Sequence, residues 1–172
     1  LLRWHHPQHG LIEPDQFIPL AEDSQLIVPI GAWVLDQACR QVILWQERGA
    51  ADLRVAVDVS PIQLRHADFV TLVEETLQRT GLQGQHLELE ITERLLSAGT
   101  GGATLEQLRS RGVRIAIDDF GNDHSSLGTL RRLAVDALRV DRSVVDALGR
   151  DASALAIVRA TLGLGCSLAL DV

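Results

Sequence analysis

The sequence predicts an α/β fold built on a parallel sheet. Short β-branched segments alternate with helical periodicities, at intervals of roughly thirty residues. Parallel strands need helices on their outer face, and the helical segments lie between the strands as this requires. Two architectures remain open, a doubly wound open sheet and a (β/α) barrel. No Gly-rich phosphate loop follows any predicted strand, which disfavours a nucleotide-binding open sheet.

Five segments have the pattern of strands. Residues 54–60 form a β-branched run that Pro61 ends, typical of a buried strand. Residues 87–92 alternate apolar and polar side chains, and residues 113–118 are mostly apolar up to Asp118. We expect shorter strands at residues 137–141 and at residues 168–172.

Helical periods fill the gaps between these strands. The longest covers residues 30–48 and ends at Gly49, with Trp33 and Trp45 expected on its apolar, core-facing side. The other expected helices cover residues 68–79, 104–111, 125–133 and 152–163.

Composition narrows the function classes. The chain has 172 residues, enough for one domain with a sizeable core. Its net charge of −7 disfavours a general nucleic-acid binder, which would normally carry a basic face. No apolar stretch approaches a membrane-spanning length, so we expect no membrane contact and a cytoplasmic location. Cys39 and Cys166 match no zinc-binding spacing.

Acidic residues gather at the carboxyl ends of the predicted strands, namely Asp58, Glu90, Glu93, Asp118, Asp119 and Asp141. In a barrel these ends converge on one mouth, where such folds carry out chemistry. So many carboxylates would repel one another without cations between them. Oxygen ligands suit Mg²⁺, Mn²⁺ or Ca²⁺, and adjacent aspartates can serve two metals about 3.5–4 Å apart.

A simpler interpretation competes at some of these positions. An aspartate after a strand is often a helix N-cap, and for Asp141 we give that alternative equal weight. The pair Asp118-Asp119 is harder to explain by capping and favours function. His5, His6 and His9 could suggest a metal cluster, but their position around Pro7 and Gly10 favours a structural loop.

Motifs along the whole chain resemble the EAL domains of cyclic di-GMP phosphodiesterases. The residues that carry the resemblance are Leu1-Leu2-Arg3-Trp4, His6-Pro7, Pro14, Phe17-Ile18-Pro19, Ile30-Gly31, Trp33-Val34-Leu35, Ala38-Cys39, Val59-Ser60, Gln63-Leu64, the segment 87–93, Asp118-Asp119-Phe120-Gly121, Ser125-Ser126-Leu127 and Val140-Asp141-Arg142-Ser143.

The resemblance implies a modified TIM-like (β/α) barrel whose first strand is antiparallel to the rest. Residues 1–172 would form a partial domain, from the end of the first strand to the start of the sixth, so the barrel would be incomplete in this chain. The implied partners are cyclic di-GMP, a second copy in a homodimer, and fused sensory or GGDEF modules.

The resemblance also implies a role for particular residues. The metal ligands for Mg²⁺ or Mn²⁺ would be Asp58, Glu90, Asp118 and Asp119. Catalytic residues would be Arg139, Glu93 and Asp141, with Glu93 bracing the loop after Asp119. Substrate-binding residues would be Arg3, which would contact a phosphate, Pro14 and Gln63.

Several positions depart from the family pattern. Asp58 stands where the family has a metal-binding Asn, and Arg139 where it has a catalytic Lys. Residues 122–124 replace a small glycine-containing turn, and the family's signature glutamate would precede Leu1. We therefore expect hydrolysis of cyclic di-GMP to linear pGpG, impaired or absent in this piece. The alternatives are a degenerate module that binds the dinucleotide or a protein partner and, as the weakest hypothesis, an unrelated barrel enzyme.

Overall fold

The computed structural model describes residues 2–93, 95, 101–120 and 135–172. The expected helix at residues 125–133 and the departures at residues 122–124 lie outside them. The strands are β1 (Trp4–His6), β2 (Gly10–Ile12), β3 (Val55–Asp58), β4 (Leu87–Thr92), β5 (Arg114–Phe120) and β6 (Ala137–Val140). The helices are α1 (Pro14–Asp23), α2 (Ile27–Glu47), α3 (Pro61–Arg65), α4 (Phe69–Thr80), the 3₁₀ turn η1 (Gly84–His86), α6 (Gly102–Ser110), α8 (Arg142–Asp146) and α9 (Ala152–Leu168).

Four parallel strands form the central sheet, in the order β3-β4-β5-β6. Over the described residues the sheet stays open, which agrees with the expected incomplete barrel. The expected strand at residues 168–172 is wrong in its extent. Leu168 still belongs to α9, and beyond this helix a single parallel bridge joins Asp171 to Ala137 on β6.

The amino-terminal segment forms an antiparallel hairpin, and the loop expected around Pro7 is its turn, while His5 and His6 lie on β1. Trp4 on β1 pairs with Ile12 on β2. The Nδ1 atom of His6 accepts hydrogen bonds from the backbone N–H groups of Gln8 and His9, at 3.1 and 3.2 Å. The structure thus gives His6 a turn-forming role, in line with the structural interpretation of the histidines.

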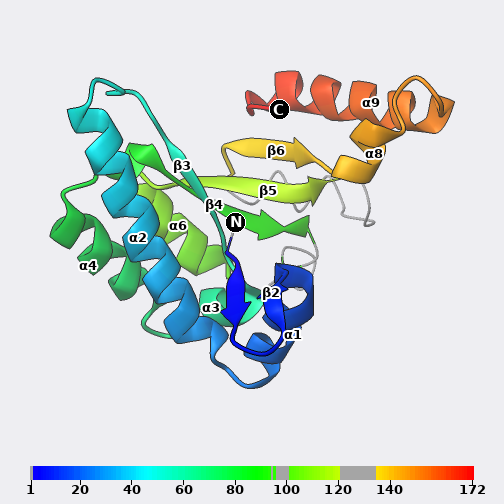
Figure 1. Ribbon diagram of the computed structural model, residues 1–172. Helices are drawn as coiled ribbons and strands as arrows, with labels where there is room; N and C mark the ends of the chain where they lie inside the picture. Colours follow the sequence, from blue (N-terminus) through cyan, green and yellow to red (C-terminus); the bar gives the residue numbers. More distant parts are fainter. Residues whose placement is uncertain (1, 94, 96–100, 121–134) are drawn as a thin grey trace.

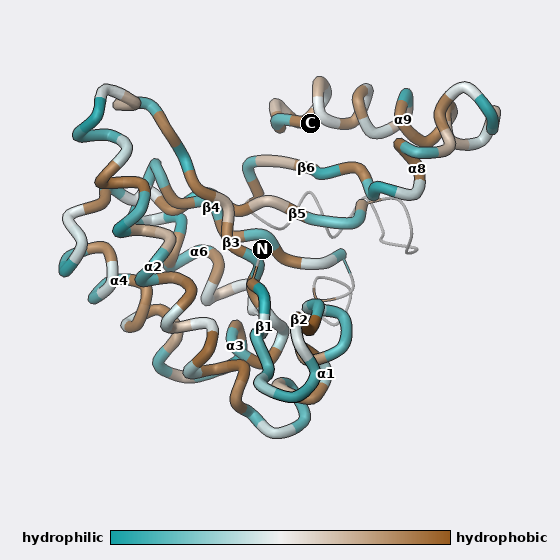
Figure 2. The backbone as a smooth tube through the Cα atoms, in the orientation of Figure 1, coloured by the Kyte–Doolittle hydropathy of each residue, from teal (hydrophilic) through white to brown (hydrophobic). Residues whose placement is uncertain are grey.

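Helices α2, α4 and α6 cover one face of the sheet (Figure 1), and the apolar core lies between these layers (Figure 2). Alternation within the strands accounts for this. Leu87, Leu89 and Ile91 of β4 are at most 1% exposed and face the helices. The residues between them, Glu88 and Glu90, therefore face the opposite side of the sheet.

Two expectations about helix α2 need correction. Its 21 residues make it long and apolar enough to cross a membrane, contrary to the expectation that no stretch approaches that length. However, Leu35, Cys39 and Val42 on α2 are buried in the core, so one side of this helix packs against the sheet layer while much of the rest stays exposed. Trp33 and Trp45, expected in the core, are 56% and 44% exposed. Trp33 is exposed because it lies roughly opposite Leu35 around the helix axis. Trp45 lies about 60° from Val42, at the border of the buried side.

Candidate functional site

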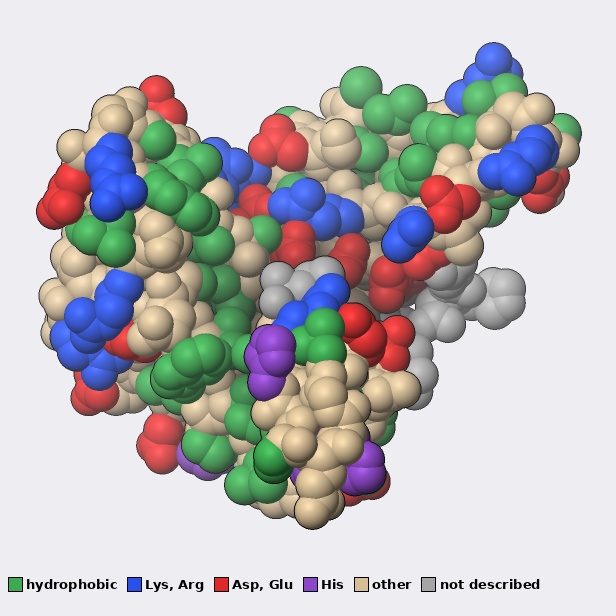
Figure 3. Space-filling view, viewed as in Figure 1, with side chains coloured by type: hydrophobic (Ala, Val, Ile, Leu, Met, Phe, Trp, Pro, Cys, Tyr) green, Lys and Arg blue, Asp and Glu red, His purple; other side chains and the backbone are tan. Residues whose placement is uncertain are grey.

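The open face of the sheet carries charged side chains where the helix-covered face carries apolar ones. Figure 3 shows acidic and basic side chains gathered in a recess over this region. Three of the expected metal ligands, Asp58, Glu90 and Asp118, come from the neighbouring strands β3, β4 and β5. We call these three residues the acid cluster.

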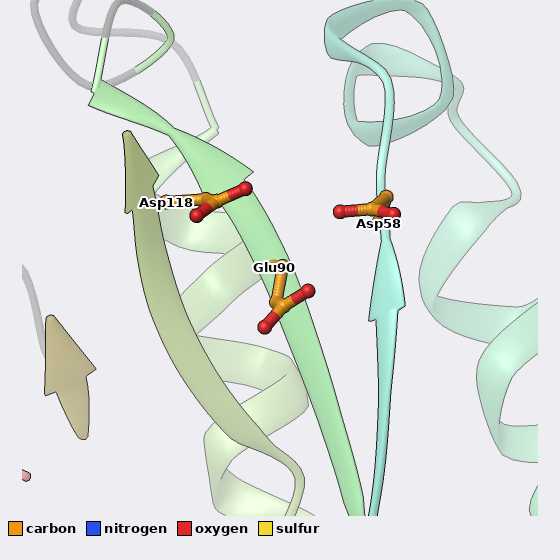
Figure 4. Close-up of side chains that lie close together, drawn as sticks. All are labelled: Asp58, Glu90 and Asp118. Carbon is orange, nitrogen blue, oxygen red and sulfur yellow. The ribbon is translucent and has the colours of Figure 1, made fainter. Parts of the chain in front are cut away.

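Strand register brings the acid cluster together. Asp58 pairs with Glu90 across β3 and β4, and Asp118 pairs with Thr92, two residues beyond Glu90. Because alternate residues of a strand share a face, all three carboxylates lie on the open face. One carboxylate oxygen from each residue lies within 4.8 Å of the others, and Figure 4 shows the side chains facing one another.

Burial and neighbouring charges together raise the pKa of Glu90, one member of the acid cluster. Burial is the largest cause that raises the pKa of Glu90 to about 7, and the charges of Asp58 and Asp118 act in the same direction. Arg139 acts against them. A carboxyl group with such a pKa keeps its proton far more readily than usual, because burial and the neighbouring carboxylates both disfavour its charged form. A divalent cation would reverse that preference.

Asp119 lies beside the acid cluster in an unusual backbone conformation. Its φ of 56° falls in the left-handed region, which non-glycine residues adopt at an energetic cost. Desolvation is the largest cause that raises the pKa of Asp119 to about 6, followed by the charge of Asp118 and a hydrogen bond with Asp141. Backbone strain and perturbed carboxyls together are typical of functional sites.

The acid cluster fits a hard divalent cation. Its donors are all carboxylate oxygens, the ligand type preferred by Mg²⁺ and Mn²⁺. Oxygens on one such cation, each about 2.0–2.6 Å from it, lie within about 5 Å of one another. The oxygen spread of 4.8 Å is compatible with this geometry.

Arg139 reaches the acid cluster from β6. Its guanidinium forms ion pairs with Glu88 and Glu90, both on β4. Sequence reasoning placed Arg139 in the site but missed Glu88, which is 3% exposed and also pairs with Arg54 and Arg114. The available signal was the alternation of β4, which puts Glu88 on the same face as Glu90.

Asp141 performs the helix-capping role that we weighed for it. Its carboxylate accepts a hydrogen bond of 2.7 Å from the backbone N–H of Ser143 and so caps α8. Asp141 also contributes to the raised pKa of Asp119, so it lies next to the residue that adjoins the acid cluster. Glu93 is 3% exposed just beyond β4, while the loop that it was expected to brace lies outside the described residues.

The expected substrate-binding residues lie in other parts of the chain. Arg3 forms an ion pair of 3.0 Å with Glu13 and lines an apolar groove of about 640 Å³ between the hairpin, α1 and α2. Pro14 begins α1. Gln63 is buried in the capping box of α3, where its Oε1 atom accepts a hydrogen bond of 3.2 Å from Ser60 N–H. The acid cluster includes none of these three residues.

Comparison with known proteins identifies the family. The EAL domain family model matches residues 1–172. The bifunctional diguanylate cyclase/cyclic di-GMP phosphodiesterase MucR of Pseudomonas aeruginosa is 49% identical over 174 residues, covering all of this chain and 25% of MucR. The cyclic di-GMP phosphodiesterase NbdA of the same organism is 41% identical, covering all of this chain and 22% of NbdA.

Solved structures agree with the sequence comparison. A structure of the MucR phosphodiesterase in complex with c-di-GMP superimposes with a TM-score of 0.94 at 49% identity, covering 99% of this chain and 70% of that one. The EAL enzyme Bd1971 superimposes with a TM-score of 0.88 at 35% identity, covering 99% of this chain and 48% of that one. The chain thus spans about a quarter of the curated relatives named above. It belongs to the EAL domain family.

Proposed function

We propose that this chain is part of a metal-dependent phosphodiesterase domain that hydrolyses cyclic di-GMP to linear pGpG. The observation that carries the proposal is the acid cluster, in which Asp58, Glu90 and Asp118 bring carboxylate oxygens within 4.8 Å of one another. Support also comes from the similarity to MucR and NbdA, whose names give this activity.

The proposed metal site would use Asp58, Glu90, Asp118 and Asp119, with Mg²⁺ or Mn²⁺ as the cation. When bound, the cation would act as a Lewis acid on a phosphoryl oxygen. The chain's own residues would hold it at the carboxyl edge of the sheet. Asp141, which hydrogen-bonds to Asp119, and Glu93, buried beside β4, would orient these ligands, and Arg139 would supply a fixed positive charge.

We propose Arg3, Pro14 and Gln63 as substrate-binding residues on the strength of the family pattern alone. The structure assigns Gln63 to a helix cap and Arg3 to an ion pair, so a substrate contact would have to coexist with these interactions. To bind a phosphate, Arg3 would have to exchange Glu13 for the phosphate. A charge-assisted hydrogen bond to the phosphate can offset the loss of the ion pair with Glu13.

A wider arrangement is part of the same proposal. Residues 1–172 would run from the end of the first barrel strand to the start of the sixth, and the bridge between Asp171 and Ala137 supports a strand beginning next to β6. The much greater length of MucR and NbdA supports fused sensory or GGDEF modules. A homodimer and a cytoplasmic location are further predictions from the family.

One observation favours a second candidate function, a module that binds cyclic di-GMP without hydrolysing it. Arg139 pairs with Glu90, so a guanidinium that cannot release its proton already neutralises part of the acid cluster. Asp58 adds a negative charge where the family has an amide. Both features would weaken turnover more than ligand binding.

Calorimetry and product analysis on the full natural protein test both candidates. We expect heat with cyclic di-GMP in the presence of Mg²⁺ or Mn²⁺, and pGpG as the product on chromatography. Binding without pGpG would select the second candidate. Neither heat nor product would contradict the proposed function in both forms.

A further inference from the structure

A buried carboxylate lies beneath the acid cluster. The side chain of Glu88 is 4% exposed and forms ion pairs with Arg54 at 3.9 Å, Arg114 at 3.3 Å, and Arg139. Burial of a charge is unfavourable unless partners compensate, so this arrangement requires the surrounding guanidinium groups. Helix capping and core packing do not account for a carboxylate at this position.

Arg139 connects this buried carboxylate to the acid cluster. Its Nη2 atom pairs with Glu88 and its Nε atom with Glu90, two residues further along the same face of β4. A guanidinium is a planar fork, so two contacts fix both its position and its orientation. An ammonium group would offer no such fork.

Strand β5 leaves room for Arg139 to cross it. Ala116 pairs with Glu90 on one side and with Ala137 of β6 on the other. Its neighbours Ile115 and Ile117 point into the helix-covered core, so the small side chain of Ala116 lies on the open face. The arginine therefore spans from β6 to β4 over a methyl group.

We propose that Glu88 is a positioning residue, which anchors Arg139 against Glu90 and thereby sets how strongly the acid cluster binds a divalent cation. This inference rests on the proposed function of that cluster. With Glu88 in place, the guanidinium charge is shared between two carboxylates. Without that anchor, the same charge is available to Glu90 and Asp118 alone, where it competes with the cation.

The test measures Mn²⁺ affinity by calorimetry on the full natural protein. Glu88→Asp keeps the charge but is one methylene shorter, so it should no longer hold Arg139. We expect Mn²⁺ binding to weaken about 10-fold, within the range for residues that orient metal ligands. Glu74→Asp is the matched control, since it shortens another glutamate–arginine pair, with Arg111 on the helical layer. It should leave Mn²⁺ affinity unchanged.

A double-mutant cycle separates positioning from a general structural or charge effect. In an Arg139→Gln background, Glu88→Asp should change Mn²⁺ affinity less than about twofold, because there is no guanidinium left to position. An equal loss in both backgrounds would overturn the proposal, and so would no loss in either. If Glu88→Asp does not give a native circular dichroism spectrum, the isosteric Glu88→Gln replaces it. Because this variant also removes a charge, some Mn²⁺ affinity should be lost in both backgrounds, but the loss should be larger when Arg139 is present, and equal losses would overturn the proposal.

The outcomes distinguish this inference from the proposed function. If Mn²⁺ binds the unmodified protein and the cycle is additive, the positioning role of Glu88 fails while the metal site stands. If Mn²⁺ and cyclic di-GMP both fail to bind the unmodified protein, the proposed function fails and the role of Glu88 at that site fails with it. A non-additive loss of Mn²⁺ affinity supports both the positioning role of Glu88 and the proposed metal site.

Discussion

The two faces of the β3–β6 sheet use the same strands for different purposes. On β4, Leu89 is 1% exposed under the helices, while its neighbour Glu90 belongs to the acid cluster on the opposite face. The apolar face gains stability from burial, and the charged face stores carboxyl repulsion. The alternation of a strand thus lets one segment of six residues serve both stability and chemistry, provided that its register is fixed.

Truncation on the apolar face should have the largest effect on stability. Leu89→Ala removes buried volume at the centre of the core and should lower the free energy of unfolding by about 2–5 kcal/mol. Urea denaturation measures this change. Mn²⁺ affinity of the folded protein should stay within about twofold, because the side chain of Leu89 points away from the acid cluster. A selective loss of metal binding without destabilisation would contradict the division between faces.

Neutralisation on the charged face should weaken metal binding and leave stability nearly unchanged, the reverse of the effect of Leu89→Ala. Glu90→Gln removes a proposed ligand and should weaken Mn²⁺ binding beyond the roughly 10–100-fold typical of outer-shell changes. Stability should hold within about 1 kcal/mol, since the variant also relieves repulsion with Asp58 and Asp118. Calorimetry and urea denaturation give the two readouts. Asp52→Asn, in an exposed turn, is the control and should change neither.

A glycine in the helical layer tests how tightly that face is packed. A Cβ atom at Gly31 of α2 would overlap the side-chain amide of Gln63 in the α3 cap. Gly31→Ala should therefore destabilise the fold by about 1–3 kcal/mol, despite the better helix propensity of alanine. Thermal denaturation measures the effect. Gly163→Ala in α9 meets nothing within 4 Å and should instead be neutral or stabilising.

A pH series measures the repulsion stored on the charged face. Folding raises the pKa of Glu90 from 4.5 to about 7, and that of Asp119 from 3.8 to about 6. The folded state then binds more protons than the unfolded state. The contribution of these two groups to the free energy of unfolding is therefore complete below about pH 4 and is lost as pH rises to about 7. In EDTA the melting temperature should fall by about 2–4 °C between pH 5 and 7.5.

Added Mn²⁺ sharpens that comparison. Since the metal binds the ionised carboxylates, it should reduce the fall in melting temperature or reverse it. Glu90→Gln is the control variant, and its melting temperature should vary less with pH. A pH series with the same slope for both proteins would show that Glu90 is not the source of the effect.

The sequence predicted the strands better than the segments between them. For β4 the expected range of residues 87–92 is confirmed at both ends, because strict alternation marks a strand with one charged face. Acidic residues at the strand ends predicted the acid cluster for the same reason, since parallel strands align their carboxyl ends. The expected core position of Trp33 is wrong because α2 carries apolar residues on more than one side, so its pattern does not define a single core face.

Other features depend on contacts between distant residues. The pairing of Glu88 with Arg139 spans 51 positions and is decided by sheet register and by the small residue at Ala116. The short antiparallel hairpin at Trp4–His6 and Gly10–Ile12 is not predicted by the sequence pattern, because three-residue strands show almost no period. The expected strand at residues 168–172 has a strand-like composition, yet α9 extends through Leu168.

Anomalous diffraction from crystals of the full natural protein grown with Mn²⁺ shows directly whether the acid cluster holds a metal ion. We expect a manganese peak about 2.0–2.6 Å from carboxylate oxygens of Asp58, Glu90 and Asp118. A protein that binds manganese elsewhere, or shows no peak at these three carboxylates at saturating Mn²⁺, would contradict it.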